Sequence, residues 1–154
     1  MRRMRDWVVH CFENYAVFTG RAARPEYWWF YLFNVLIVMA IYVLTLGQSG
    51  LRAPLVFFLW AFTFVPHLAV ASRRLHDTGH SFWWALAPVG IVAVPIAALG
   101  LTKAADLRNL FAAAILIVLL LASLGYAIWL LILLCRQSDA GPNRYGDPAP
   151  TTPG

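Results

Sequence analysis

Four long runs of apolar residues follow one another along the chain and are separated by short polar segments. The runs cover residues 28–46, 54–71, 82–101 and 110–134. Each is close to the roughly 17–25 residues that an α-helix needs to cross a hydrocarbon core of about 30 Å. The pattern therefore predicts an all-α membrane protein with a single four-helix transmembrane domain over residues 28–135. Residues 1–27 and 136–154 are predicted to lie outside the hydrocarbon core.

A shorter amphipathic pattern precedes the first run. Between residues 6 and 18, apolar side chains recur at helical spacing, while polar residues occupy the other face. This spacing predicts a short amphipathic helix. Arg2, Arg3 and Arg5 in front of it favour a position in the cytoplasmic interface against anionic lipid. The alternative is that its apolar face packs on the protein's own helices.

Composition agrees with the membrane class. Apolar residues make up 61% of the chain, and charged residues make up 12%, about half of the usual share of about 25%. The net charge is +5, but the basic residues lie beside the apolar runs and form no continuous basic helix, so a nucleic-acid partner is not expected. Cys11 and Cys135 have no paired spacing, and no metal or cofactor is expected.

The distribution of Lys and Arg predicts the orientation in the membrane. Five of these residues lie in residues 1–27, two in the polar segment between the second and third runs, and two in the tail. The opposite side has three, namely Arg52, Lys103 and Arg108. Because basic residues concentrate in cytoplasmic segments of membrane proteins, both termini are predicted to be cytoplasmic.

The densest chemistry lies in the polar segment 72–81. It holds two guanidinium groups, a carboxylate and two imidazoles, from Arg73, Arg74, Asp77, His76 and His80. So polar a segment must stand at a membrane surface or line a protected cavity. It also reads as the end of a helix, since Arg73 and Arg74 suit the last turn and Gly79 suits a left-handed cap.

Pairs of tryptophans stand at the beginning of the first and third runs. They are Trp28-Trp29 and Trp83-Trp84. Indole rings are enriched at the headgroup level of a bilayer. These four residues are therefore expected to anchor the helices at the membrane interface.

Three motifs, taken in order, resemble one family. They are Phe18-x-Gly20-Arg21-Ala22-x-Arg24-x-Glu26-Tyr27-Trp28-Trp29, then Arg73-Arg74-Leu75-His76-Asp77-Thr78-Gly79-x-Ser81-x-Trp83-Trp84, then Gly141-x-Asn143-Arg144-Tyr145-Gly146. In type and order they resemble the domain of unknown function 805 family, small bacterial inner-membrane proteins, over about residues 10–148. The resemblance implies a multi-helix protein of the bacterial inner membrane. It brings no established activity, substrate or catalytic residue.

All three motifs fall on the side predicted to be cytoplasmic, and we expect them to converge on one polar site. Guanidinium groups bind phosphate and carboxylate bidentately, so the site is expected to hold a small anion or an anionic lipid headgroup. Its expected members are Arg21, Arg24, Glu26, Arg73, Arg74, His76, Asp77, Asn143, Arg144 and Tyr145. The alternative is that Arg–Glu and Arg–Asp pairs only lock the helix ends together.

Two other classes of function are open to the sequence. A small channel or transporter is the second reading, because Pro66 and His67 interrupt the second apolar run. It would require a homo-oligomer, since four helices enclose little space. An enzyme is not expected, because His76, Asp77 and His80 match no recognised metal or catalytic spacing. The prediction is an accessory or binding component, with the lipid bilayer and a further membrane protein or a second copy as partners.

Overall fold

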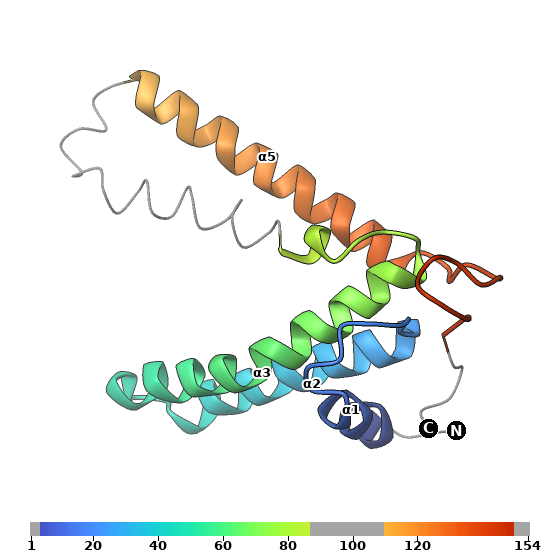
Figure 1. The fold of residues 1–154 in the computed structure, drawn as a ribbon. Coiled ribbons are helices and arrows are strands. Elements are labelled where there is room, and N and C mark those ends of the chain that lie inside the picture. Colours follow the sequence, from blue (N-terminus) through green and yellow to red (C-terminus); the bar gives the residue numbers. More distant parts are fainter. Residues whose placement is uncertain (1–3, 87–109, 150–154) are drawn as a thin grey trace. The chain divides into compact units, whose positions relative to one another are not determined.

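A computed structural model describes residues 4–86 and 110–149 of the chain. Within these residues the regular elements are helices, apart from an isolated β-bridge between Asn143 and Gly146 (Figure 1). The named helices are α1 (Met4–Glu13), α2 (Arg24–Leu44), α3 (Ser49–Asp77) and α5 (Leu110–Cys135). The predicted all-α class is therefore confirmed for the described part of the chain.

Three of the described helices are long and apolar enough to cross a membrane. They are all of α2, the stretch Gly50–Asp77 of α3 and the stretch Ile117–Cys135 of α5. These overlap the first, second and fourth predicted runs. Residues 83–86 of the third run are helical, and the remainder of that run, up to residue 101, lies outside the described residues. Helix α3 is longer than its predicted run at both ends, so Ser72 to Asp77 form its last turns.

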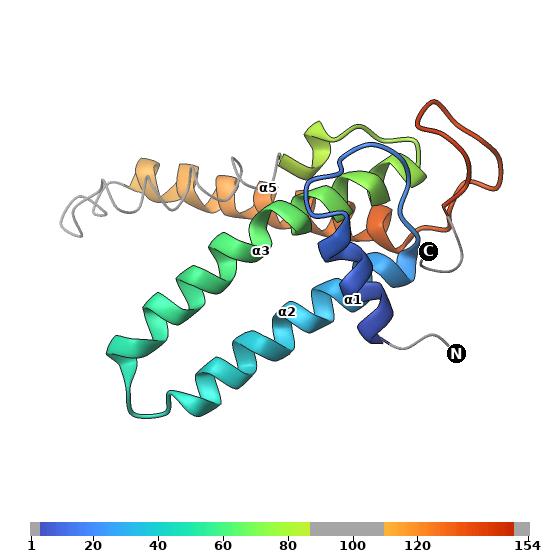
Figure 2. The ribbon, with the colours of Figure 1, turned by 60° about the horizontal axis from the view of Figure 1, so that its bottom comes forward.

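Helices α2 and α3 form an antiparallel hairpin and pack on each other (Figure 2). Gly47 takes a φ of +81° in the connecting turn, where a side chain would be disfavoured. Pro66 lies inside α3 and cannot donate a hydrogen bond to the carbonyl of Phe62. The hydroxyl of Tyr15 donates to that carbonyl instead, at 2.6 Å. The proline is thus tolerated because a side chain replaces the lost backbone donor.

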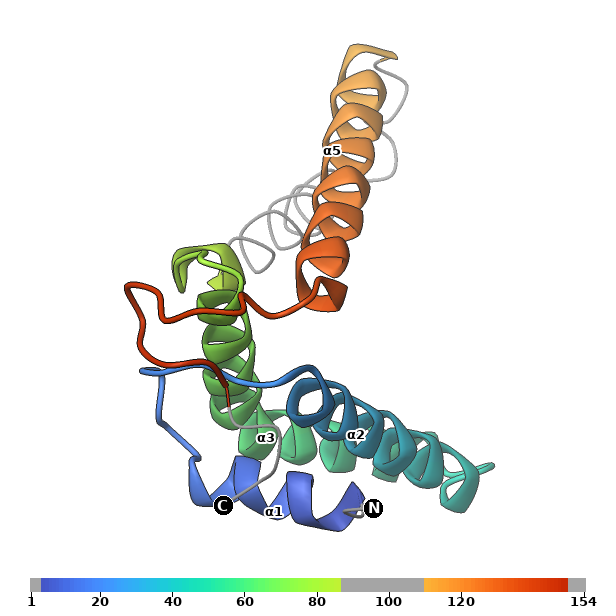
Figure 3. The same cartoon turned by 90° about the vertical axis from the view of Figure 1, so that its right-hand side faces the viewer.

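Helix α1 packs against α2 and α3 (Figure 3). Its residues Trp7, Val8 and Cys11 are buried, and the ring of Phe12 meets that of Phe30 edge-on at 5.4 Å. The apolar face of α1 therefore packs on the protein's own helices, which is the second of the two alternatives predicted from the sequence. A position of its outer face against the membrane surface stays a prediction.

Helix α1 ends at Glu13, five residues before the end that periodicity predicts. The side-chain amide of Asn14 donates to the carbonyl of His10 at 2.9 Å, and the backbone N–H of Asn14 donates to the same carbonyl at 3.1 Å. Asparagine competes with the backbone in this way and favours helix ends. Tyr15 and Phe18 follow the helix and keep its apolar periodicity. Both still contact the rest of the fold, since Tyr15 donates a hydrogen bond to α3 and the ring of Phe18 lies against that of Phe82.

The described residues divide into two compact units. One contains the chain up to Phe82 together with the tail from Gln137, and the other runs from Trp83 to Arg136. In the second unit, the hydroxyl of Tyr126 in α5 donates to the carbonyl of Trp84 at 2.8 Å. Trp28 is half-buried, whereas Trp29, Trp83 and Trp84 are exposed. Their role as interface anchors stays a prediction.

Candidate functional site

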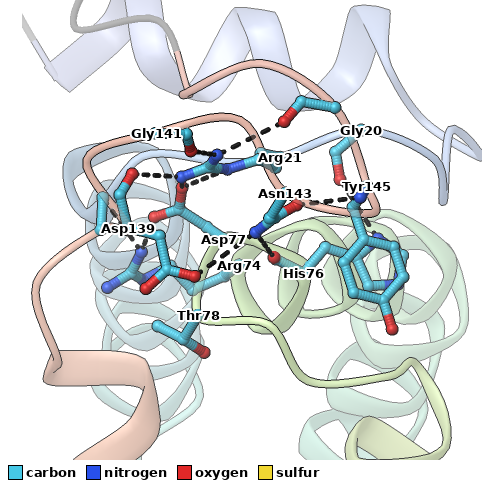
Figure 4. Close-up of polar contacts among 12 residues, drawn as sticks. Gly20, Arg21, Arg74, His76, Asp77, Thr78, Asp139, Gly141, Asn143 and Tyr145 are labelled. Atoms are coloured by element: carbon cyan, nitrogen blue, oxygen red, sulfur yellow. Dashed lines mark hydrogen bonds and ion pairs between the residues drawn. The ribbon is translucent and has the colours of Figure 1, made fainter.

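The centre of the polar site is the carboxylate of Asp77, the last residue of α3 (Figure 4). Arg21, from the segment before α2, binds Oδ1 through Nε and Nη2, each at 2.8 Å. Arg74, one turn before Asp77, forms an ion pair with Oδ2. The exposed fractions of these three side chains are 0–1%. Two buried guanidinium groups thus share one carboxylate.

Arg21 also binds the backbone of the C-terminal tail. Its Nη2 donates to the carbonyl of Asp139 at 2.6 Å, and its Nη1 donates to those of Gly141 at 2.7 Å and Gly146 at 3.4 Å. In return, the N–H of Asp139 donates to the carbonyl of Asp77 at 3.2 Å. One side chain therefore joins three segments that lie far apart in the sequence.

His76 and the tail form a second part of this arrangement. The imidazole of His76 lies against the ring of Tyr145, with ring centroids 3.9 Å apart and an interplanar angle of 5°. Its Nδ1 lies 3.1 Å from the carbonyl of Gly20. Asn143 donates to the carbonyl of His76 at 3.0 Å and accepts from the N–H of Tyr145 at 2.9 Å. These contacts join the tail loop to the end of α3.

A second buried ion pair joins α2 to α3. Nη1 of Arg73 lies 2.7 Å from Oε1 of Glu26, and the two side chains are 6% and 1% exposed. Glu26 lies in the first turn of α2, and its carboxyl group accepts a hydrogen bond from the backbone N–H of Ala23, the residue before the helix. N–H groups at the start of a helix have no partner within the helix, and Glu26 supplies one. The N–H of Ala22 donates to the carbonyl of Arg73 at 3.0 Å.

The thiol of Cys11 in α1 lies against Glu26. Its Sγ is 3.8 Å from the carbonyl of Glu26 and 4.0 Å from Oε1. Burial, and then the negative charge of Glu26, raise the pKa of Cys11 to about 12, because both disfavour the thiolate. Sequence reasoning did not place Cys11 at the site, and its position on the apolar face of α1 was the one available signal.

The expected site residues are thus brought together in part. Arg21, Arg74, Asp77, His76, Asn143 and Tyr145 share one cluster, Arg73 and Glu26 form a separate pair, and Arg144 and Arg24 are exposed. Arg144 donates to the carbonyl of Gly79 at 3.0 Å and lies 4.7 Å from the ring of Tyr145. Arg24 makes no hydrogen bond or ion pair with the described residues.

The histidine that suggested a channel lies among aromatic rings. The ring centroids of Tyr27, Phe30 and Tyr31 are 5.9, 6.1 and 6.2 Å from that of His67. Within the described part of the chain, its environment is therefore a packed aromatic one.

Fold and site together define a helical membrane protein in which hydrogen bonds from Arg21 and Asn143 join a C-terminal tail to the helix ends. The chain belongs to the family described as "Protein of unknown function (DUF805)", whose model matches residues 15–147. It is similar to Inner membrane protein YhaI of Escherichia coli (strain K12), with 34% identity over 143 residues that cover 92% of this chain and 93% of YhaI. Inner membrane protein YhaH of the same strain is 41% identical over 85 residues, 53% of this chain and 70% of YhaH. No solved structure matches the chain. The resemblance seen in the motifs is confirmed.

Proposed function

We propose that the protein is a non-catalytic binding component of the bacterial inner membrane and binds the headgroup of an anionic lipid at its cytoplasmic end. In this proposal both termini and the tail lie on the cytoplasmic side, as the distribution of basic residues predicts. The location is supported by the relatives, which are named as inner membrane proteins.

The guanidinium group of Arg73 carries the proposal. Its Nη1 binds Glu26, but Nε and Nη2 are buried and have no hydrogen-bond partner among the described residues. Nε and Nη2 form one edge of the guanidinium group, and this edge fits two oxygens of a phosphate or carboxylate. A buried donor without a partner costs about 1–3 kcal/mol. Ligand oxygens at this edge would remove that cost.

Charge at this end of the molecule also favours an anion. The buried Arg, Asp and Glu side chains of the described residues are three arginines and two carboxyl groups, from Arg21, Arg73, Arg74, Glu26 and Asp77, and burial raises the pKa of the Glu26 carboxyl. Arg24 and Arg144 add two exposed cations at the same end of the first unit, and Asp139 and Asp147 of the tail add two exposed carboxylates, so five arginines face four carboxyl groups there. A lipid phosphate in the cytoplasmic leaflet would therefore meet a positive site, and basic groups near such a surface contribute about 1 kcal/mol each.

The test is Arg73→Lys, because lysine keeps the positive charge beside Glu26 and removes the free guanidinium edge. We would purify the protein in nanodiscs that contain phosphatidylglycerol and phosphatidylethanolamine, and count retained lipids by native mass spectrometry. The expected result is about 10–100-fold weaker retention of phosphatidylglycerol, since a hydrogen bond to a charged group contributes about 1.5–3 kcal/mol. Thermal stability should change little.

Arg5→Gln is the matched control, because Arg5 is an exposed cation on the predicted cytoplasmic side and outside the site. Equal retention of phosphatidylglycerol by Arg73→Lys and wild type would overturn the proposal. A water molecule would then be the expected partner of Nε and Nη2 of Arg73. Displacement of the retained lipid by millimolar inorganic phosphate would show that the site selects the free anion.

A further inference from the structure

A second cationic position lies near the other end of the α2–α3 hairpin. At about 1.5 Å per residue, roughly 32 Å of helix separates Arg52 from Arg73 along α3. This length is close to the hydrocarbon thickness of about 30 Å. If one of these arginines is at one headgroup level, the other is therefore at the opposite level. Arg52 lies on the side that the distribution of basic residues predicts to be external.

The side chain of Arg52 is held in place by α2. Its Nη2 donates to the carbonyl of Thr45 at 2.9 Å, its Nε lies 3.2 Å from Oγ1 of Thr45, and its guanidinium carbon is 4.8 Å from the centroid of the Tyr42 ring. These contacts use one edge and one face of the group. Nη1 has no partner, and no carboxylate pairs with Arg52, among the described residues. The positive charge is therefore fixed in position, and no carboxylate of the described residues neutralises it.

An apolar groove of about 470 Å³ begins at this guanidinium group. It is lined by Tyr42, Arg52, Ala53, Val56, Phe57 and Trp60. Arg52, Val56 and Trp60 follow one another at intervals of four residues and so lie along one face of α3. The groove therefore extends about 12 Å from the headgroup level toward the middle of the bilayer.

We infer that this groove binds one anionic phospholipid, with the phosphate at Nη1 of Arg52 and an acyl chain along Val56, Phe57 and Trp60. The combination requires an amphiphile with a negative head and an apolar chain on the same side, because the cation stands at the end of the groove and the rest of the lining is apolar. Nη1 carries N–H donors that no described residue uses, and hydrogen bonds from a charged guanidinium group to phosphate oxygens are among the strong ones. This site is independent of the cytoplasmic one and stands or falls separately.

Arg52→Gln tests the inference in the same nanodiscs. We expect it to lose one retained phosphatidylglycerol per protein, with about tenfold or greater weakening, while the lipid that depends on Arg73 remains. Lys103→Gln is the matched control, since it removes one charge from the same predicted side. The double variant Arg52→Gln with Arg73→Lys should lose both lipids.

Two other occupants are distinguished by their own variants. A second copy of the chain in the groove would give a dimer that Phe57→Ala dissociates without any change in the lipid count. An ion pair of Arg52 with Asp106, a residue outside the described ranges, would make Asp106→Asn and Arg52→Gln equally destabilising, again at a constant lipid count. Either result would overturn the lipid site, as would equal lipid loss in Arg52→Gln and Lys103→Gln.

Discussion

Replacement of Asp77 by asparagine should be one of the most damaging single-atom changes in this protein. Asp77 is fully buried and holds two guanidinium groups that are themselves 0–1% exposed. The amide of asparagine removes the negative charge and turns one acceptor into a donor. Arg21 and Arg74 would then face each other as buried cations with no carboxylate between them.

The expected loss of stability follows from the cost of an uncompensated buried charge. Removal of one partner from a buried ion pair destabilises proteins by about 3–5 kcal/mol. That range corresponds to an increase in the unfolding equilibrium constant of roughly a hundredfold to a few thousandfold. Thermal or denaturant unfolding of purified protein in detergent, followed by tryptophan fluorescence, would measure it.

Asp147→Asn is the control, because Asp147 lies exposed in the same tail and forms no ion pair with the described residues. A loss below about 1 kcal/mol for Asp77→Asn, the level of an exposed pair, would refute the reasoning. A double-mutant cycle with Arg21→Gln adds a second check. If the ion pair is the cause, the double variant should lose less than the sum of the single losses.

Two further predictions concern Cys11 and Gly79. At pH 8, below both pKa values, the thiol of Cys11 should react with maleimide about a thousandfold more slowly than a free cysteine, because its pKa is about 12 and the ordinary value is 9.0. The reaction rate of Cys11 should rise as the pH approaches 12. The Cys135→Ser variant reports the rate of Cys11 and the Cys11→Ser variant that of Cys135, and similar rates for the two would contradict the prediction. Gly79→Ala should cost about 1–2 kcal/mol, because Gly79 has a φ of +75°. Gly141→Ala, where a new Cβ meets open space and φ is not positive, should change the unfolding free energy little, and equal costs would argue against a backbone cause.

Apolar run length was sufficient to locate α2, α3 and α5, because crossing a membrane demands a long uninterrupted apolar segment. It was not sufficient for the ends of α3, which extend into polar sequence. Arg74, His76 and Asp77 lie in the last turns of α3, and Arg74 and Asp77 form a buried ion pair there, which a hydropathy pattern does not contain. The helix-end reading of this segment was correct for Gly79, whose positive φ follows Asp77 closely.

Residue type also predicted which side chains gather at the site better than how they pair. Arg21 and Asp77 were both expected there, but Arg21 uses most of its donors on backbone carbonyls of the tail. A carbonyl is present at every residue, so its involvement leaves no trace in composition or periodicity. The indirect signal is Gly146, whose φ of +122° allows the tail to turn its carbonyl toward Arg21.

The arrangement around Arg21 also bears on how the chain is made. Arg21 precedes α2, Asp77 ends α3, and the carbonyls of Asp139 and Gly141 follow α5, so the cluster draws on segments synthesised at the beginning, middle and end of translation. It can form only after the last helix has left the ribosome. In the proposed topology, all three segments emerge on the cytoplasmic face of the bilayer. With this topology, a chain with one helix inserted in the wrong direction would leave Arg21 without its tail partners, so formation of the cluster would depend on correct membrane insertion.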